Sequence, residues 1–231
     1  MEKKLIISVK DLVKTFTLGD NIVKAVNHVS FDVYSGEMVA ITGKSGIGKS
    51  TLLNLLGGLD KPDSGTVTVD GREITSMKDK ELAEYRRKSS GFVFQFFNLI
   101  SVLNVEENLA LPLNLDGKEA DEARVDELLE LLGLSDKRHH FASQLSGGQQ
   151  QRVAIGRAII ANPPCIFADE PTGNLDSKNS AEIVELFKKL VKDFGTTIVL
   201  VTHDPNVAAQ ADRVITMSDG SIVSDKENAH E

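Results

Sequence analysis

A short stretch in the first quarter of the chain reads Gly43-Lys44-Ser45-Gly46-Ile47-Gly48-Lys49-Ser50. It fits the pattern G-x-x-x-x-G-K-[ST], in which backbone N–H groups of a glycine-rich loop surround a phosphate group. An apolar, strand-like run at residues 37–42 precedes the loop, and an apolar helical pattern at residues 52–56 follows it. Because the N-terminus of such a helix carries a partial positive charge, the arrangement favours an anion. The stretch therefore predicts a nucleotide site between a strand and a helix.

The side chains of this loop have different expected roles. The ammonium group of Lys49 is expected to reach the β- and γ-phosphates, and the hydroxyl group of Ser50 to bind Mg²⁺. The hydroxyl group of Thr51 is placed to bond the α-phosphate. The residues expected to surround the nucleotide are Gly43, Lys44, Ser45, Gly46, Ile47, Gly48, Lys49, Ser50 and Thr51.

Two carboxylates follow the apolar run at residues 165–168, and they are Asp169 and Glu170. In a parallel sheet, ligands lie at the carboxyl ends of the strands, so both carboxylates are expected beside the phosphate loop. Asp169 is predicted to hold Mg²⁺, and Glu170 to accept a proton from the attacking water as a general base. Acidic residues are common where a strand meets solvent, so this pair has weight only together with the loop.

The remaining pattern predicts an α/β protein with a mainly parallel sheet. In the last third, apolar runs at residues 165–168, 196–202 and 213–217 alternate with helical patterns, which favours parallel pairing. The middle of the chain has apolar residues at helical spacing and reads as an insertion into the sheet domain. We expect one domain over residues 1–231, with a core at 1–89 and 161–224, a helical insertion at about 90–160 and a polar tail at 225–231.

A second glycine loop opens another predicted helix with Ser146, Gly147, Gly148 and Gln149. Ser146 is placed as the N-cap of that helix. One interpretation is a capped helix after a glycine turn and nothing more. The other is a second anion site, which implies either two ligands or one ligand shared between two chains.

Composition excludes several classes of protein. The 26 Lys and Arg residues against 34 Asp and Glu residues give a net charge of −8, which does not favour general binding to nucleic acid or to anionic lipid. The single cysteine, Cys165, excludes an internal disulfide framework. No apolar run approaches the roughly 20 residues needed to span a bilayer, and no secretory signal is expected at the start of the chain. We therefore expect no nucleic-acid partner and no direct insertion into lipid.

Several motifs in sequence order resemble those of the ATP-binding-cassette (ABC) ATPases, and the resemblance covers nearly the whole chain. Residues 145–149 match the LSGGQ signature of that family, and residues 173–176 match its D-loop. Phe16 matches the aromatic residue that stacks on adenine, Gln95 the glutamine of the Q-loop, and His203 the switch histidine.

The resemblance implies a RecA-like P-loop core with a mainly parallel sheet, an antiparallel β subdomain and an inserted helical subdomain. It implies ATP and Mg²⁺ as cofactors and ATP hydrolysis as the activity. It further implies a head-to-tail pair of copies, in which the signature loop of one copy completes the nucleotide site of the other. The implied catalytic residues are Glu170, His203, Lys49 and Gln95, the implied metal ligands are Ser50, Gln95 and Asp169, and the implied nucleotide contacts from outside the phosphate loop are Phe16, Ser146, Gly147, Gly148 and Gln149.

Residues 94–100, 107–113 and 168–176 are similar to one branch of the family, which serves lipoprotein release, macrolide export and peptide-antibiotic resistance. That likeness implies a transmembrane permease as partner, mechanotransmission as the mode of coupling and a place at the cytoplasmic face of the cell membrane. Residues 96–103, which are mostly apolar, are expected either to receive a permease helix or to pack inside the helical insertion.

Two alternatives remain open at this stage. One is an ABC ATPase that drives a transmembrane signalling or cell-wall-hydrolase-regulating complex without transport. The other is an ABC ATPase associated with DNA or ribosomes, which the acidic charge and the lack of a coiled-coil insertion or basic arm disfavour.

Overall fold

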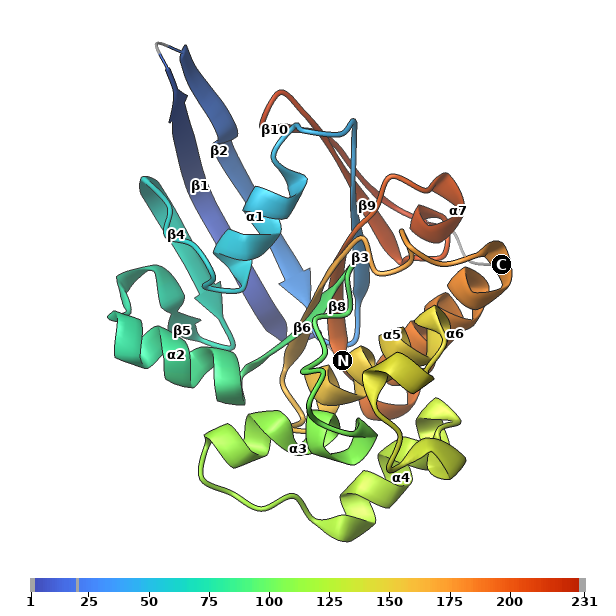
Figure 1. The fold of residues 1–231 in the computed structure, drawn as a ribbon. Coiled ribbons are helices and arrows are strands. Elements are labelled where there is room, and N and C mark those ends of the chain that lie inside the picture. The colour runs from blue at the N-terminus through green and yellow to red at the C-terminus, as the bar shows by residue number, and fades with distance from the viewer. Residues whose placement is uncertain (1–2, 20, 229–231) are drawn as a thin grey trace.

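Residues 3–19 and 21–228 are described by a computed structural model of the chain, shown in Figure 1. The strands are β1 (Leu5–Leu18), β2 (Asn21–Tyr34), β3 (Met38–Thr42), β4 (Ser64–Val69), β5 (Arg72–Glu73), β6 (Ser90–Phe94), β7 (Cys165–Asp169), β8 (Thr197–Val201), β9 (Arg213–Ser218) and β10 (Ser221–Glu227). The helices are α1 (Lys49–Leu56), α2 (Asp79–Lys88), α3 (Val105–Leu115), α4 (Glu122–Leu132), α5 (Gly147–Ile159), α6 (Ser177–Phe194) and α7 (Pro205–Ala208), with single 3₁₀ turns at Ile74–Ser76, Ser135–Lys137 and Ala142–Gln144.

The central strands are apolar throughout because both faces of their sheet are buried. Successive side chains of a strand point to opposite faces. On β7, Cys165 and Phe167 enter one apolar cluster, and Ile166 and Ala168 enter the other. All four side chains are fully buried. This double burial explains why the sequence shows a continuous apolar run instead of an alternating one.

The main sheet has the strand order β10-β9-β3-β8-β7-β6 in the described part of the chain. Pairing is parallel from β9 to β6, and β10 joins the edge in the antiparallel direction. The prediction of an α/β fold with a mainly parallel sheet is therefore confirmed. Parallel pairing brings the carboxyl ends of β3, β8, β7 and β6 to one edge of the sheet, where ligands bind in this class of fold.

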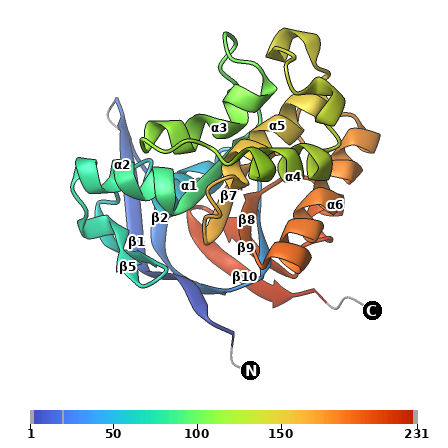
Figure 2. The same ribbon diagram turned by 90° about the horizontal axis from the view of Figure 1, so that it is seen from below.

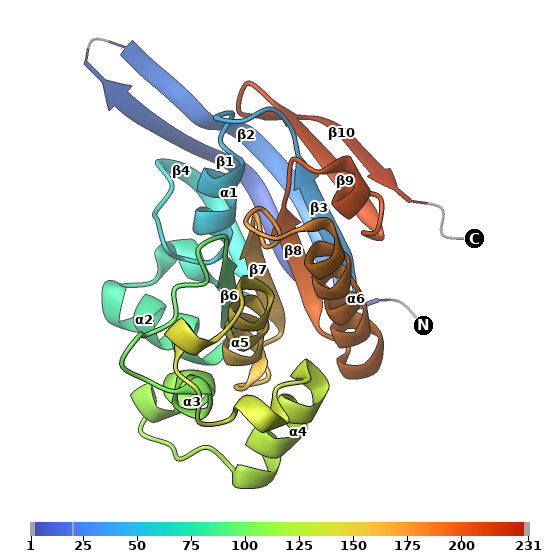
Figure 3. The same ribbon diagram turned by 45° about the vertical axis from the view of Figure 1, so that its right-hand side comes forward.

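A separate antiparallel sheet has the order β2-β1-β4-β5 and confirms the expected β subdomain. Helix α1 lies between this sheet and the main sheet, as Figure 3 shows. Leu52 and Leu56 of α1 are fully buried together with Leu12 of β1 and Val26 of β2. One apolar cluster thus joins both sheets through α1.

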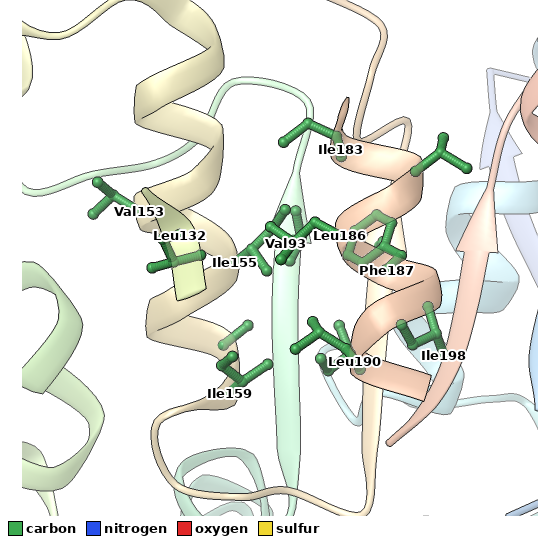
Figure 4. Packing of buried hydrophobic residues seen from close by; sticks show 14 of the residues in the cluster. Val93, Leu132, Val153, Ile155, Ile159, Ile183, Leu186, Phe187, Leu190 and Ile198 are labelled. Carbon is green, nitrogen blue, oxygen red and sulfur yellow. The ribbon is translucent and has the colours of Figure 1, made fainter. Parts of the chain in front are cut away.

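Helices α3 and α4 lie side by side next to α5, and α3 also borders α2 (Figure 2). Helices α5 and α6 cover one face of the main sheet, and Figure 4 shows Ile155 of α5 and Leu186 of α6 beside Val93 of β6. Gly133 follows the last residue of α4 and caps it, and its φ of 65° is the left-handed conformation expected at a helix end. No helix within residues 3–19 and 21–228 combines the length and the apolar character needed to cross a bilayer.

The structure refines two expected boundaries. Residues 90–94, at the expected start of the helical insertion, form β6 and pair with β7, so the helical part begins after Phe94. The tail was expected from residue 225, but β10 continues to Glu227; residues 229–231 lie outside the described part. An edge strand carries charged residues facing solvent, so β10 has little apolar pattern. The feature of the sequence that indicates β10 is the preceding pair Asp219-Gly220, which is typical of a tight turn between antiparallel strands. Both residues have positive φ in the structure.

Phe187→Ala should lower the free energy of unfolding by about 3–5 kcal/mol, because its fully buried ring fills the space between α6 and the main sheet. The matched control is Phe194→Ala in the same helix, since that ring is 40% exposed. The control should lose about 1 kcal/mol or less. Urea unfolding of both variants measures the difference, and equal losses would contradict this description of the core.

Candidate functional site

The glycine-rich loop lies between β3 and α1, as its sequence predicted. The ammonium group of Lys49 is buried and donates hydrogen bonds to the carbonyl oxygens of Gly43, at 3.0 Å, and Lys44, at 2.9 Å. These two bonds hold a positive charge inside the curve of the loop. Because the first N–H groups of α1 have no helical partners, the loop and the helix together offer an anion site.

Gly48 is the residue of the loop at which a side chain is least tolerable. Its φ is 101°, and a Cβ atom added there would lie 1.8 Å from the carbonyl oxygen of Ala25 on β2. No rearrangement of a flexible side chain relieves that clash, because the neighbouring atom belongs to the backbone. The glycine thus allows the phosphate loop to pack directly against the antiparallel sheet.

Asp169 and Ser50 meet at the carboxyl end of β7. The Ser50 hydroxyl donates to Oδ1 of Asp169 at 2.9 Å. Burial raises the pKa of the Asp169 carboxyl group, and the neighbouring Glu170 adds to the rise; the hydrogen bond from Ser50 and the charge of Lys49 act in the opposite direction. A carboxylate and a hydroxyl held this way form an oxygen donor pair, which is the ligand type that Mg²⁺ prefers.

Glu170 lies one residue further on, in an unusual backbone conformation with a φ of 46°. Its N–H group donates to the carbonyl oxygen of Val201 at 3.0 Å, and its own carbonyl oxygen accepts from Gly173 at 3.0 Å. Its carboxylate lies 2.9 Å from Nδ1 of His203, which follows β8. The carboxylate is 18% exposed and the imidazole 68%, so both groups are accessible at the edge of the sheet.

Gln95 follows β6 and is held by a residue of the predicted D-loop. Its Nε2 donates to Oδ1 of Asn174 at 3.2 Å, and Nδ2 of Asn174 donates to the carbonyl oxygen of Gln95 at 3.0 Å. The paired amides tie the loop after β6 to the loop after β7. Sequence reasoning had not assigned Asn174 a role in the site.

A cleft of about 600 Å³ lies over these groups. One wall comes from the antiparallel sheet, where the ring of Phe16 is 41% exposed and Lys14 Nζ lies 5.4 Å from the ring centroid. The opposite wall comes from the carboxyl ends of the main sheet. The lining residues are Phe16, Thr17, Val23, Ala25, Ser45, Gly46, Gly48, Lys49, Ser50, Thr51, Gln95, Glu170 and His203.

Most of the predicted site residues therefore meet in one place. Asp169 does not line the cleft itself, but it accepts a hydrogen bond from Ser50, which does. The carbonyl oxygens of Gly43 and Lys44 accept hydrogen bonds from the Lys49 ammonium group, which also lines the cleft. The side chain of Ile47 differs from the others, because it packs against the apolar cluster between the two sheets.

The second glycine loop lies elsewhere. Ser146 caps α5: its Oγ accepts from the N–H of Gln149 at 3.3 Å, and its own N–H donates to Oε1 of Gln149 at 2.9 Å. A Cβ atom at Gly148 would lie 2.3 Å from Oδ1 of Asn179, so the start of α5 packs tightly on the start of α6. Among the residues that the structure describes, the lining of the 600 Å³ cleft includes none of Ser146, Gly147, Gly148 and Gln149.

The arrangement agrees with comparison to known proteins. A family model with the description "ABC transporter" matches residues 26–173. The chain belongs to the ABC transporter family. A dimeric post-hydrolysis structure of the ATP-binding cassette MJ0796, bound to ADP and Pi, superimposes with a TM-score of 0.89 at 43% identity, covering 98% of this chain and 100% of that chain. Within the family, the chain is an ATPase domain.

Relatives within the ABC transporter family include both long and short proteins. The macrolide export ATP-binding/permease protein MacB of Chlorobaculum tepidum is 48% identical over 95% of this chain. MacB of Escherichia coli K12 is 46% identical over 94% of it. The chain spans about a third of the length of these two relatives (34%). An uncharacterized ABC transporter ATP-binding protein of Thermotoga maritima is 48% identical over 95% of this chain and 94% of its own length.

Asp169→Asn should stabilise the chain at neutral pH when neither Mg²⁺ nor nucleotide is present. Since the folded-state pKa of Asp169 is raised, ionising this carboxyl group costs free energy in the folded chain. That cost is complete above the folded pKa and absent below the unfolded pKa of about 3.9. The advantage of the variant should therefore shrink as the pH falls through this interval. The measurement is urea unfolding at several pH values.

The matched control for this experiment is Glu119→Gln, which neutralises an exposed carboxylate in a loop. It should change the free energy of unfolding by no more than about 0.5 kcal/mol at any of these pH values. If Asp169→Asn destabilised the chain at neutral pH, the burial argument for its carboxyl group would be wrong.

Proposed function

We propose that this chain is the ATP-hydrolysing subunit of a membrane ABC transporter and works as a head-to-tail pair of copies. The observation that carries the proposal is the cleft between the two sheets. It brings together an exposed aromatic ring, a buried ammonium group in a glycine loop, and a carboxylate paired with an imidazole. A nucleoside triphosphate offers matching chemistry, with a base at one end and three phosphates at the other.

ATP would lie with its adenine on Phe16 and its phosphates in the loop around Lys49. Aromatic stacking suits the base, and the loop N–H groups suit the β-phosphate. Ser50 and Asp169 would hold Mg²⁺, with Gln95 as the further ligand. Their oxygen donors fit that ion, because Mg²⁺ is usually bound by one or two carboxylates together with substrate phosphates. When bound, the ion would neutralise charge on the phosphates.

Glu170 would act as the general base. Its carboxylate is accessible and lines the same cleft as Lys49, which would hold the γ-phosphate. It accepts the proton of the attacking water, and His203, 2.9 Å from that carboxylate, holds the γ-phosphate in position. Catalysis then depends mainly on positioning and on fixed positive charge, as is usual for phosphoryl transfer.

Ser146, Gly147, Gly148 and Gln149 would complete the site of a second copy. They lie outside the cleft of their own chain, and the N-terminus of α5 is suited to an anion. A second solved structure of the MJ0796 cassette is described as dimeric and is 44% identical, with a TM-score of 0.88. In a two-fold pair, each copy gives its loop to the other, so two ATP molecules would be enclosed.

The partner would be a transmembrane permease, which places the chain at the cytoplasmic face of the cell membrane. The MacB relatives are named as combined ATP-binding/permease proteins, and this chain matches about a third of their length. A surface suited to such a partner follows β6, where Phe96 is 74% exposed and Val102 is 77% exposed. Closure of the ATP-bound pair would drive the permease by mechanotransmission, and hydrolysis would reset it.

Glu170→Gln should lower the rate of ATP hydrolysis by a factor of about 10² or more, the usual contribution of a general base. Glutamine keeps the size of the side chain but does not accept the proton from water. Binding should survive, because Lys49, Ser50 and Asp169 are unchanged. Light scattering with ATP should then show a persistent pair of copies for the variant and mostly single chains for the parent.

ADP is the control for that experiment, because it lacks the γ-phosphate and should not support the pair. The base assignment fails if the variant hydrolyses ATP at the parent rate. The dimer mechanism fails if the variant binds ATP and stays a single chain.

Ser146→Arg should abolish hydrolysis without abolishing nucleotide binding, because the added cation obstructs the partner's nucleotide and leaves the chain's own loop intact. Lys49→Ala should also be inactive, because it damages the chain's own phosphate loop and leaves the loop that it gives to the partner intact. An equal mixture of the two variants should recover about a quarter of the parent rate, since half the pairs are mixed and each mixed pair has one intact site. No recovery in the mixture would argue against a shared site.

A further inference from the structure

Gln151 lies on α5, about one and a half turns after Ser146, and its side chain is fully buried. Nε2 donates a hydrogen bond to the carbonyl oxygen of Pro171. Within the described residues, Oε1 has no hydrogen-bond partner. A buried acceptor without a partner is unfavourable, and an apolar side chain of the same length would fill the space without it. Packing alone therefore does not explain a glutamine here.

Pro171 directly follows Glu170, the residue with a φ of 46°. This left-handed conformation is unfavourable for a residue with a side chain and persists only where the surroundings hold it. Two backbone bonds, to Val201 and from Gly173, hold Glu170 itself. Because proline has no N–H group, its backbone is held through its carbonyl oxygen, and Gln151 provides that bond.

We propose that Gln151 is a positioning residue: its bond to Pro171 holds the turn that aims the Glu170 carboxylate into the cleft. The inference rests on the proposed role of Glu170 as the general base. Gln151 itself touches none of the reacting atoms. Arg152, the next residue, donates to Glu182 of α6 at 2.6 Å, so α5 is fixed to α6 beside this bond. The helix that would contact the partner's nucleotide thus also holds the base of its own chain.

The test is Gln151→Met, which keeps the length of the side chain and removes the donor. At saturating ATP, kcat should fall about tenfold, because a small displacement of a catalytic group costs at least that much. The dissociation constant for ATP should stay within about twofold of the parent. Slower hydrolysis should also let the ATP-dependent pair accumulate in light scattering.

The matched control is Asn108→Leu, which removes another buried amide that donates to backbone carbonyl oxygens, in this case those of residues 100, 103 and 104 beside α3. It should lower Tm and leave kcat within about twofold of the parent. The comparison separates loss of stability from loss of positioning.

Gln151→Glu provides a second test, the pH dependence of kcat. If Gln151 only stabilised the fold, this pH dependence would be the same in the variant and the parent. Burial should raise the pKa of the introduced carboxyl group, and only its protonated form donates to the Pro171 carbonyl oxygen. The kcat of this variant relative to the parent should therefore rise as the pH falls from about 8 to about 6.

The positioning role is overturned if Gln151→Met keeps the parent kcat while Glu170→Gln is inactive. It is also overturned if Gln151→Met loses ATP binding or folding and the Gln151→Glu ratio is flat with pH. If instead Glu170→Gln hydrolyses ATP at the parent rate, the proposed base is wrong and the role of Gln151 fails with it.

Discussion

The parallel pairing of β3, β8 and β7 determines where Lys49, His203 and Glu170 lie. Ile41 of β3 pairs with Val201 of β8, and Val201 pairs with Asp169 of β7, so the three strands end at the same level. The loops that follow then bring Lys49, His203 and Glu170 into one cleft. A slip of one residue would turn every side chain of a strand to the other face. The apolar clusters on both faces of the sheet exclude that slip.

The predictable part of the site consists of residues that directly follow an apolar strand or open a helix. The structure places Glu170 and His203 in the lining of the cleft and bonds Asp169 to Ser50 beside it, because each follows a buried strand and parallel pairing aligns the strand ends. The expected tail begins inside the edge strand of the same sheet, because residues 225–227 belong to β10. An edge strand needs only one neighbour and one buried face, so the end of β10 carries little apolar pattern.

Gln151 and Asn174 were beyond the reach of sequence patterns for a different reason. A glutamine in a predicted helix normally indicates a solvated face, and its burial depends on the loop that begins at Pro171, 20 positions later in the sequence. The bond between Gln95 and Asn174 likewise joins residues 79 positions apart. Such contacts arise only when segments distant in the sequence have already packed, so neither composition nor spacing indicates them.

The apolar cluster that contains Leu12, Val26 and Leu52 joins the two walls of the cleft from behind. The width of the cleft is therefore a property of this core and not of the residues that line it. A nucleotide that contacted both walls, as proposed, would link the two sheets, and its binding free energy would add to the stability of the folded chain. A substitution that loosens the core should then weaken nucleotide affinity. At saturating nucleotide, the loss of stability that it causes should be smaller.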